Sequence, residues 1–130
     1  MTASLVGRRI LVVEDELIVA WLLEDMLADL GCVVVGPAAR IAEALEMIEA
    51  QEVDAAVLDV CLNEQFSYPI AEALVARGAP FMFATGYDKA RLRQDFKSHP
   101  VLQKPFHRSE LRAALLKLFR PPGQGAAASH

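Results

Sequence analysis

Five short apolar runs alternate along this chain with longer segments whose apolar residues recur at helical spacing. Short runs that are rich in Val, Leu and Ile and bounded by polar residues are typical of strands buried on both faces of a sheet. Strands that alternate with helices predict a parallel sheet with right-handed crossovers and helices on both faces. The sequence therefore predicts an α/β fold with five strands: Arg9–Val13, Cys32–Val35, Ala55–Val60, Pro80–Thr85 and Val101–Gln103.

Five helices are predicted around this sheet. Four of them have a clear apolar face, whereas Tyr87–Phe96 is charged and has only a weak one, so we expect a short or mobile helix there. The residues from Leu62 to Tyr68 are expected to form a polar loop. The predicted helices are Leu17–Leu30, Ile41–Ala50, Pro69–Arg77, Tyr87–Phe96 and Ser109–Phe119.

The first predicted helix carries a tryptophan on the side away from its apolar face. At about 100° per residue, Trp21 falls beside Glu24 and Asp25. A tryptophan in this position either packs against the edge of a neighbouring helix or anchors a partner protein. The residues predicted to face the core are Val19, Leu22, Leu23, Met26, Leu27 and Leu30.

The composition indicates one globular domain. The chain has 130 residues, 54% of them hydrophobic and 23% charged, which is enough to bury a core. We expect an N-terminal extension at residues 1–8, the domain at residues 9–119 and a disordered tail at residues 120–130.

Several classes of function are disfavoured by the charge and the cysteines. A net charge of −4 without a run of Lys or Arg argues against nucleic-acid binding. Cys32 and Cys61 form no disulfide framework or metal motif, so reduced thiols are expected. No segment is long and apolar enough for a signal peptide or a membrane span, which predicts a soluble, cytoplasmic protein.

Polar residues stand where four of the predicted strands end. Glu14 and Asp15 follow the first strand, Asp59 ends the third, Thr85 ends the fourth and Lys104 follows the fifth. Ligands of open parallel sheets bind at the carboxyl ends of the strands, where the strand order reverses. The alternative, a solvated acidic rim with a lysine partner, accounts for each residue singly. It does not account for five such residues at strand ends.

These residue types suit Mg²⁺ and phosphoryl chemistry. Three neighbouring acids raise one another's pKa unless a cation lies among them, and a hard divalent ion such as Mg²⁺ prefers oxygen ligands. The carboxylate of Asp59 can act as a nucleophile and form an acyl phosphate, and it needs no general base because it is already ionised at neutral pH. Lys104 and Thr85 can stabilise the charge on the phosphoryl oxygens.

The ordered motifs are similar to those of a known family. Leu11–Glu16, Leu58–Val60, Ala84–Gly86 and Lys104–Phe106 resemble the receiver domain of bacterial two-component response regulators, over nearly the whole chain from Arg9 to Phe119. The resemblance implies a flavodoxin-like, doubly wound sheet with strand order 2-1-3-4-5.

The resemblance also implies a role for each site residue. Asp59 would accept a phosphoryl group from a histidine kinase or a histidine phosphotransfer protein, with Thr85 as the switch hydroxyl and Lys104 contacting the phosphate. The protein would catalyse its own Mg-dependent phosphorylation and slow hydrolysis of the aspartyl phosphate, without being a dedicated enzyme. Mg²⁺ would be held by Glu14, Asp15, Asp59 and the backbone carbonyl of Cys61.

A narrower resemblance is carried by Phe83–Tyr87, which is similar to the signature of the FAT GUY subgroup of receivers, and by Ser67–Pro69. Most of the wider family has an aromatic residue on the fifth strand, three residues before the lysine, and here that position is Val101. Tyr87 is then either a substitute aromatic switch or an exposed loop tyrosine.

A stand-alone receiver that signals by protein contact or phosphorelay is therefore expected, because no output domain follows Phe119. Its kinase would dock near Trp21 and the loop after Lys104. One alternative is a receiver-fold binding module that works without phosphorylation. A hydrolase with an aspartyl nucleophile is disfavoured. The motif of such enzymes has a second Asp two residues after the nucleophile, and this chain has Cys61 at that position. A flavodoxin-like cofactor binder is disfavoured too, because no Gly-rich loop follows the first strand.

Overall fold

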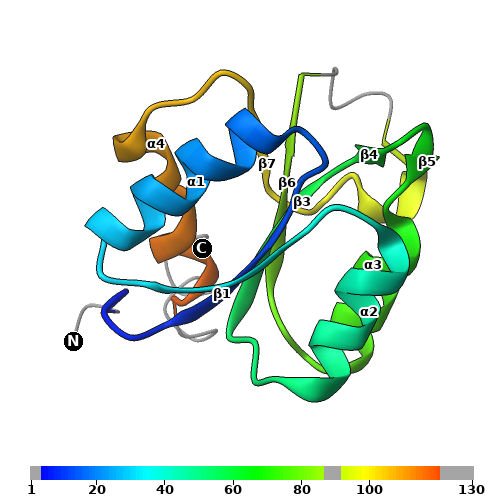
Figure 1. The fold of residues 1–130 in the computed structure, drawn as a ribbon, viewed down its shortest axis with the longest axis horizontal. Coiled ribbons are helices and arrows are strands. Elements are labelled where there is room, and N and C mark those ends of the chain that lie inside the picture. The colour runs from blue at the N-terminus through cyan, green and yellow to red at the C-terminus, as the bar shows by residue number, and fades with distance from the viewer. Residues whose placement is uncertain (1–3, 87–91, 121–130) are drawn as a thin grey trace, which may run out of the picture.

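A five-stranded parallel sheet forms the centre of the protein (Figure 1). The computed structural model describes residues 4–86 and 92–120. The strand order is β2-β1-β3-β6-β7, which confirms the predicted flavodoxin-like order of the five strands. The strands are β1 (Arg9–Val13), β2 (Val33–Ala38), β3 (Ala55–Asp59), β6 (Phe81–Thr85) and β7 (Val101–Gln103).

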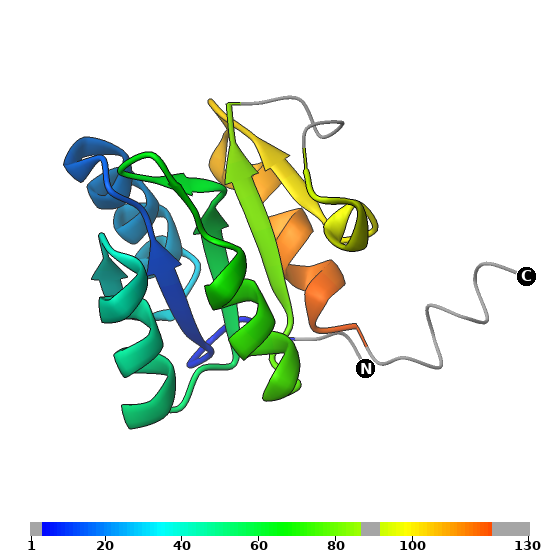
Figure 2. The same cartoon turned by 90° about the vertical axis from the view of Figure 1, so that its right-hand side faces the viewer.

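Helices cover both faces of the sheet (Figure 2). On one face, α1 and α4 bury Leu23, Leu27, Leu111 and Leu115 against the strands. On the other face, α2 and α3 pack into a second apolar cluster with β3 and β6. The helices are α1 (Leu17–Asp29), α2 (Ile41–Ala50), α3 (Tyr68–Ala76) and α4 (Arg108–Leu118).

The prediction of five helices is wrong for the part of the chain that the structure describes, where four α-helices are present. Of the expected helix Tyr87–Phe96, residues 87–91 lie outside the described residues, and Gln94–Phe96 forms a single 3₁₀ turn, η2. Leu92 and Phe96 are the buried residues of this stretch. Two buried residues four apart do not make the continuous apolar stripe that holds a longer helix on a core.

The expected polar loop after β3 instead forms a small antiparallel hairpin of β4 (Cys61–Leu62) and β5 (Gln65–Phe66). The two residues of its turn, Asn63 and Glu64, have φ values of 47° and 69°. Two successive residues with positive φ are what a tight turn between right-twisted strands requires. Asn adopts this conformation readily, whereas Glu does so at some energetic expense.

Fewer residues of the first helix are buried against the sheet than its sequence pattern predicted. All five residues of β3 are buried, as expected for a central strand covered on both faces. Along α1 the buried residues are Ala20, Leu23 and Leu27, while Leu22 is 54% exposed. The predicted apolar face was therefore too wide. Gly31, with φ of 87°, ends this helix where the sequence placed its end.

Leu5 and Gly7, which precede β1, both contact the domain. Leu5 is buried in the cluster beneath α1 and α4, and the Gly7 N–H donates a hydrogen bond to the Gly31 carbonyl at 2.8 Å. The last part of the predicted tail, residues 121–130, lies outside the described residues. Within the described ranges, every helix is too short or too polar to cross a bilayer.

Candidate phosphoacceptor and metal site

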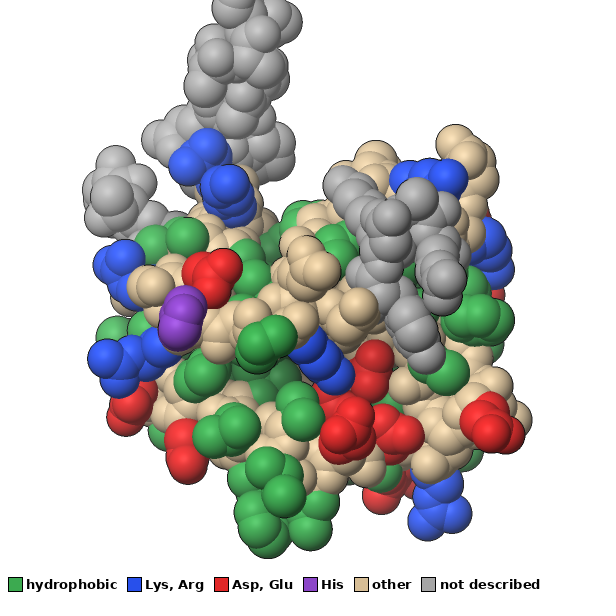
Figure 3. Space-filling view, turned by 90° about the horizontal axis from the view of Figure 1, so that it is seen from above, with side chains coloured by type: hydrophobic (Ala, Val, Ile, Leu, Met, Phe, Trp, Pro, Cys, Tyr) green, Lys and Arg blue, Asp and Glu red, His purple; other side chains and the backbone are tan. Residues whose placement is uncertain are grey.

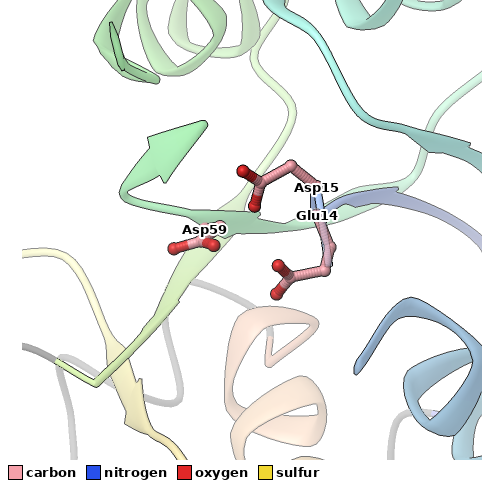
Figure 4. A group of neighbouring side chains, drawn as sticks. All are labelled: Glu14, Asp15 and Asp59. Atoms are coloured by element: carbon pink, nitrogen blue, oxygen red, sulfur yellow. The ribbon is translucent and has the colours of Figure 1, made fainter. Parts of the chain in front are cut away.

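Three carboxylates meet at the carboxyl ends of β1 and β3 (Figure 4). Glu14 and Asp15 directly follow β1, and Asp59 is the last residue of β3, the strand that pairs with β1 in parallel. One ligand oxygen of each side chain lies within 4.8 Å of the other two. The strand register thus brings together the three acids that the sequence analysis assigned to one site.

Lys104 lies directly against two of these acids. Its Nζ is 2.5 Å from Glu14 Oε1 and 3.3 Å from Asp59 Oδ2. Its backbone N–H donates to the carbonyl of Thr85 at 2.9 Å, which ties the residue after β7 to the last residue of β6. Thr85 is buried and borders the same cleft. Figure 3 shows acidic side chains gathered beside a basic one on the face where the strands end.

The cleft at these strand ends has a volume of about 480 Å³. Asp15, Asp59, Thr85 and Lys104 line it, and so does Cys61. Glu14 lies beneath, only 4% exposed, with its carboxylate beside those of Asp15 and Asp59 and in contact with Lys104. The structure therefore brings the five predicted residues together, and it places Cys61 beside them.

Burial and neighbouring charge both act on the ionisation of this site. Burial raises the pKa of Asp59, Lys104 lowers it, and the nearby Glu14 raises it again, so that the pKa of Asp59 lies at about 6. Burial alone would lower the pKa of Lys104, but its hydrogen bond to Glu14 and the charges of both acids raise it above its ordinary value. Lys104 is therefore a permanent ammonium, and Asp59 is ionised at neutral pH at an electrostatic penalty.

Backbone groups hold the acids in place. The Glu16 N–H donates to Glu14 Oε2 at 3.1 Å, the Asn63 N–H to Asp15 Oδ2 at 2.9 Å, and the Cys61 N–H to Asp59 Oδ1 at 3.4 Å. Two of these donors come from the β4–β5 hairpin, which the sequence analysis had treated as a polar loop. The hairpin that places the Asn63 N–H beside Asp15 depends on the positive φ of Asn63, which cannot be read from the sequence.

Ser67 is a further residue that the sequence analysis did not assign to the site. A serine just before Tyr-Pro at a helix start reads as an N-cap. In the structure its side chain makes no capping hydrogen bond. The hydroxyl points back along the chain and donates to the backbone carbonyl of Asp59 at 2.5 Å.

The donor set fits a hard divalent cation. Three carboxylates and one ammonium leave a net charge of −2 at the site when Asp59 is ionised. Carboxylate oxygens are the ligands that Mg²⁺ prefers, and Mg²⁺ keeps several waters rather than needing a full protein cage. Among the residues that the structure describes, this is the one group of three or more acidic, Cys or His side chains close enough to share an ion.

A second, apolar groove of about 360 Å³ adjoins the acidic cleft and shares Glu16 and Lys104 with it. It lies between α1 and the residues that follow β7, and its other lining residues are Val19, Leu22, Leu23, Met26, Pro105 and Phe106. On the same helix, Leu17, Ile18 and Trp21 are more than half exposed.

Two residues from the sequence analysis stand apart from this geometry. Tyr87 lies outside the described residues. Val101, at the position where many receivers carry an aromatic residue, is half-buried at the margin of the apolar cluster under α2 and α3. The described residues thus contain no aromatic at that position.

Comparison with known proteins points to one family. A family model described as the response regulator receiver domain matches residues 10–116. The transcriptional regulatory protein PdtaR of Mycobacterium tuberculosis is 31% identical over 114 residues, which cover 85% of this chain and 56% of that protein. The chain thus spans little more than half the length of this relative.

Solved structures agree with the same fold. The solution structure of SdrG from Sphingomonas melonis Fr1 is 41% identical with a TM-score of 0.79, covering 91% of this chain and 100% of that one. A BeF3-activated conformation of SdrG gives a TM-score of 0.76 at the same identity, covering 91% and 99%. The response regulator PhyR from Brucella abortus is 26% identical with a TM-score of 0.80, covering 98% of this chain and 54% of PhyR.

Proposed function

The chain belongs to the response regulator receiver family, and from this premise we propose that Asp59 accepts a phosphoryl group from a histidine kinase or a histidine phosphotransfer protein. One observation carries the proposal: Glu14, Asp15, Asp59, Thr85 and Lys104 meet in or directly beneath one cleft. The phosphorylated protein then signals by contact with a downstream protein or passes the phosphoryl group onward in a relay.

The transfer step uses Asp59 as the nucleophile. A carboxylate oxygen of Asp59 forms a bond to the phosphorus of the donor's phosphohistidine, while the P–N bond breaks and its electron pair returns to the imidazole nitrogen. The product is an acyl phosphate on Asp59. No general base takes part, because Asp59 with a pKa of about 6 is already ionised at neutral pH.

Charge stabilisation is the main task of the surrounding residues. The Lys104 ammonium already contacts Asp59 Oδ2, so it is in position to bind an oxygen of the incoming phosphoryl group. Thr85 lines the same cleft, and its hydroxyl would supply a further donor. Glu14, Asp15, Asp59 and the backbone carbonyl of Cys61 would hold Mg²⁺. The bound ion would neutralise negative charge on the phosphoryl oxygens.

Phosphorylation is read out through the end of β6 and the residues that follow. The new charge on Asp59 attracts the Thr85 hydroxyl and biases the segment from Tyr87 to Phe96 between two arrangements. We assign the protein to the FAT GUY subgroup on the Phe83–Tyr87 motif, with Tyr87 taking the place of the aromatic that is absent at Val101.

The phosphoryl donor docks beside the acidic cleft. The apolar groove between α1 and Pro105–Phe106 adjoins Lys104, and the exposed Trp21 lies on the same helix. A donor seated there would bring its phosphohistidine to Asp59, with Trp21 as an anchor. We further propose that the protein works in the cytoplasm. PdtaR is a transcriptional regulatory protein by name, and it is nearly twice as long as the part that matches here.

The test is phosphorylation of the purified protein by acetyl phosphate and by candidate histidine kinases, with and without Mg²⁺. We expect Mg-dependent labelling of the wild type and no labelling of Asp59→Asn. Asp54→Asn is a matched control, because Asp54 is also an aspartate beside β3 but accepts the Arg9 N–H at the opposite end of the sheet. Label that persists on Asp59→Asn would remove the acceptor assignment. A wild type that takes no label but still binds its partner would favour a module that works without phosphorylation.

A further inference from the structure

Ser67 is fully buried, and both its backbone and its side chain bind the segment that follows the acceptor aspartate. The Ser67 hydroxyl donates to the carbonyl of Asp59 at 2.5 Å, and the Ser67 N–H donates to the carbonyl of Val60 at 2.8 Å. One residue thus holds two consecutive carbonyl groups. A hydroxyl at a helix start ordinarily caps that helix, and this one does not.

The two carbonyls belong to the two peptide groups that connect Asp59 to Cys61. A peptide group is planar, so the Val60 carbonyl and the Cys61 N–H turn together as one rigid unit. Fixing the Val60 carbonyl therefore fixes the direction of the Cys61 N–H. That N–H lies 3.4 Å from Asp59 Oδ1 and is its donor on the side opposite to Lys104, which contacts Oδ2.

The same anchoring extends to the rest of the acidic site. Between Cys61 and Ser67 the chain makes the β4–β5 hairpin, whose Asn63 N–H donates to Asp15 Oδ2 at 2.9 Å. The turn residues Asn63 and Glu64 adopt positive φ, a conformation that side chains other than Gly rarely adopt without support from the surrounding structure. Ser67 closes this hairpin at its second end.

We propose that Ser67 is a positioning residue for the phosphoacceptor site: by holding the two peptide groups after Asp59, it fixes the orientation of the Asp59 carboxylate and of the hairpin that contacts Asp15. This inference rests on the proposed function for its effect on phosphoryl transfer, but not for its effect on the metal site. Residues that orient metal ligands typically change metal affinity by about 10- to 100-fold when they are lost.

The test uses Ser67→Ala, which removes the hydroxyl that holds the carbonyl of Asp59 itself and leaves the backbone hydrogen bond to the Val60 carbonyl. The variant therefore measures how much the orientation of the first peptide group after the Asp59 side chain depends on the hydroxyl. We expect the dissociation constant for Mg²⁺ to rise about tenfold, measured from the amide signals of Asp59 and Cys61 in a Mg²⁺ titration followed by NMR. We also expect the initial rate of phosphorylation by acetyl phosphate at saturating Mg²⁺ to fall about tenfold or more.

The matched control is Ala71→Gly, at a fully buried position in the first turns of α3, which weakens the helix but keeps the backbone hydrogen bond from the Ala71 N–H to the Ser67 carbonyl. It should leave both quantities within about twofold of the wild type. If Ser67→Ala does not fold, Ser67→Cys replaces it, because a thiol has a similar shape but is a weak donor.

Values for the Ser67 variant within twofold of the wild type in both measurements would overturn the proposal. An equal loss in Ala71→Gly would also overturn it, because general destabilisation would then explain the effect. A wild type that binds Mg²⁺ but takes no phosphoryl group would refute the proposed function alone, and the Mg²⁺ titration would still decide the role of Ser67.

Discussion

The acidic site and the aromatic cluster beside α3 differ in whether the interactions among their side chains are all favourable. In the acidic site, one ammonium faces three carboxylates, and the pKa of Asp59 is raised to about 6. In the aromatic cluster under α3, Tyr68 stacks on Phe96 with ring centroids 5.4 Å apart and meets Phe83 edge-on at 6.3 Å.

The aromatic cluster leaves its polar groups satisfied. The Tyr68 hydroxyl accepts the Arg93 N–H at 2.8 Å, and the Arg93 guanidinium lies over the rings of both Tyr68 and Phe96. The same guanidinium pairs with Glu72 on α3. Every contact there favours the same folded arrangement, whereas the contacts of the acidic site compete. The difference indicates that the aromatic cluster stabilises the fold, whereas the acidic site has excess negative charge that could bind a cation.

The largest expected effect is on the aromatic side. Phe83→Ala removes a fully buried ring that contacts Tyr68, Phe81 and Phe96. We expect the free energy of unfolding to fall by about 3–5 kcal/mol, measured by urea denaturation. Phe66→Ala, which removes an exposed ring stacked on the same tyrosine, should lower it by less than about 1 kcal/mol. Equal losses would mean that burial does not set the stability of this cluster.

On the acidic side, Lys104→Met should act mainly on chemistry. The variant keeps the length of the side chain but removes the ammonium that contacts Glu14 and Asp59. We expect phosphorylation by acetyl phosphate to slow by about 100-fold, because one stabilising positive charge is lost from the transition state. Lys117→Met, on an exposed position of α4, should leave the rate unchanged. A Lys104→Met variant that is phosphorylated as fast as the wild type would exclude a role for this charge.

The competition among the acids should also appear as a dependence of stability on pH. The pKa of Asp59 is about 6 in the folded protein and near 3.8 when unperturbed, so the folded state binds the proton more tightly. The stability that this group contributes is fully present below about pH 4 and is lost as the pH rises through about 6. Because solvent in the cleft screens part of the effect, we expect a loss of about 1 kcal/mol rather than the full value of the shift.

Asp59→Asn should remove this pH dependence, and Mg²⁺ should reverse the loss in the wild type by favouring the ionised form. Urea midpoints across this pH range, in chelator and in Mg²⁺, measure both effects. If the free energy of unfolding of the wild type rises through pH 6 without Mg²⁺, the claim that ionised Asp59 destabilises the folded state is wrong.

The smallest expected effect on stability is at Trp21, which is 55% exposed on α1. Trp21→Ala should change the free energy of unfolding by less than about 0.5 kcal/mol and leave phosphorylation by acetyl phosphate unchanged. Transfer from the histidine kinase that labels the wild type fastest should slow at least fivefold, an estimate based on the loss of an interface anchor. Glu24→Ala, on the same helix, is the control. Unchanged transfer from the kinase would remove Trp21 from the docking surface.

The strands and the acidic site were predictable from the sequence because both follow from simple rules. A buried parallel strand shows as an unbroken apolar run, and the carboxyl ends of such strands share one edge, so Asp59 and Lys104 could be placed together although they are 45 residues apart. The exposure of Leu22 could not be predicted, because the apolar groove beside it leaves part of the helix face uncovered.

Other features lie beyond local sequence patterns. The β4–β5 hairpin depends on positive φ at Asn63 and Glu64, for which Glu gives no signal. The hydrogen bond of Ser67 depends on where the chain returns after that hairpin, which no local pattern specifies. The 3₁₀ turn at Gln94–Phe96 replaces part of a predicted helix because Leu92 and Phe96 bury too little apolar surface to hold a longer helix on the core.

The hairpin after Asp59 also limits how this part of the chain can change in length. Surface connections usually tolerate insertions and deletions. Here Asn63 is tied to Asp15 near the middle of the segment, and Ser67 is tied to Asp59 at its end. Adding or removing one residue would shift one of the two attachments out of reach. Related sequences that keep this arrangement should therefore vary by substitution within the interval from Asp59 to Ser67, and keep its length constant.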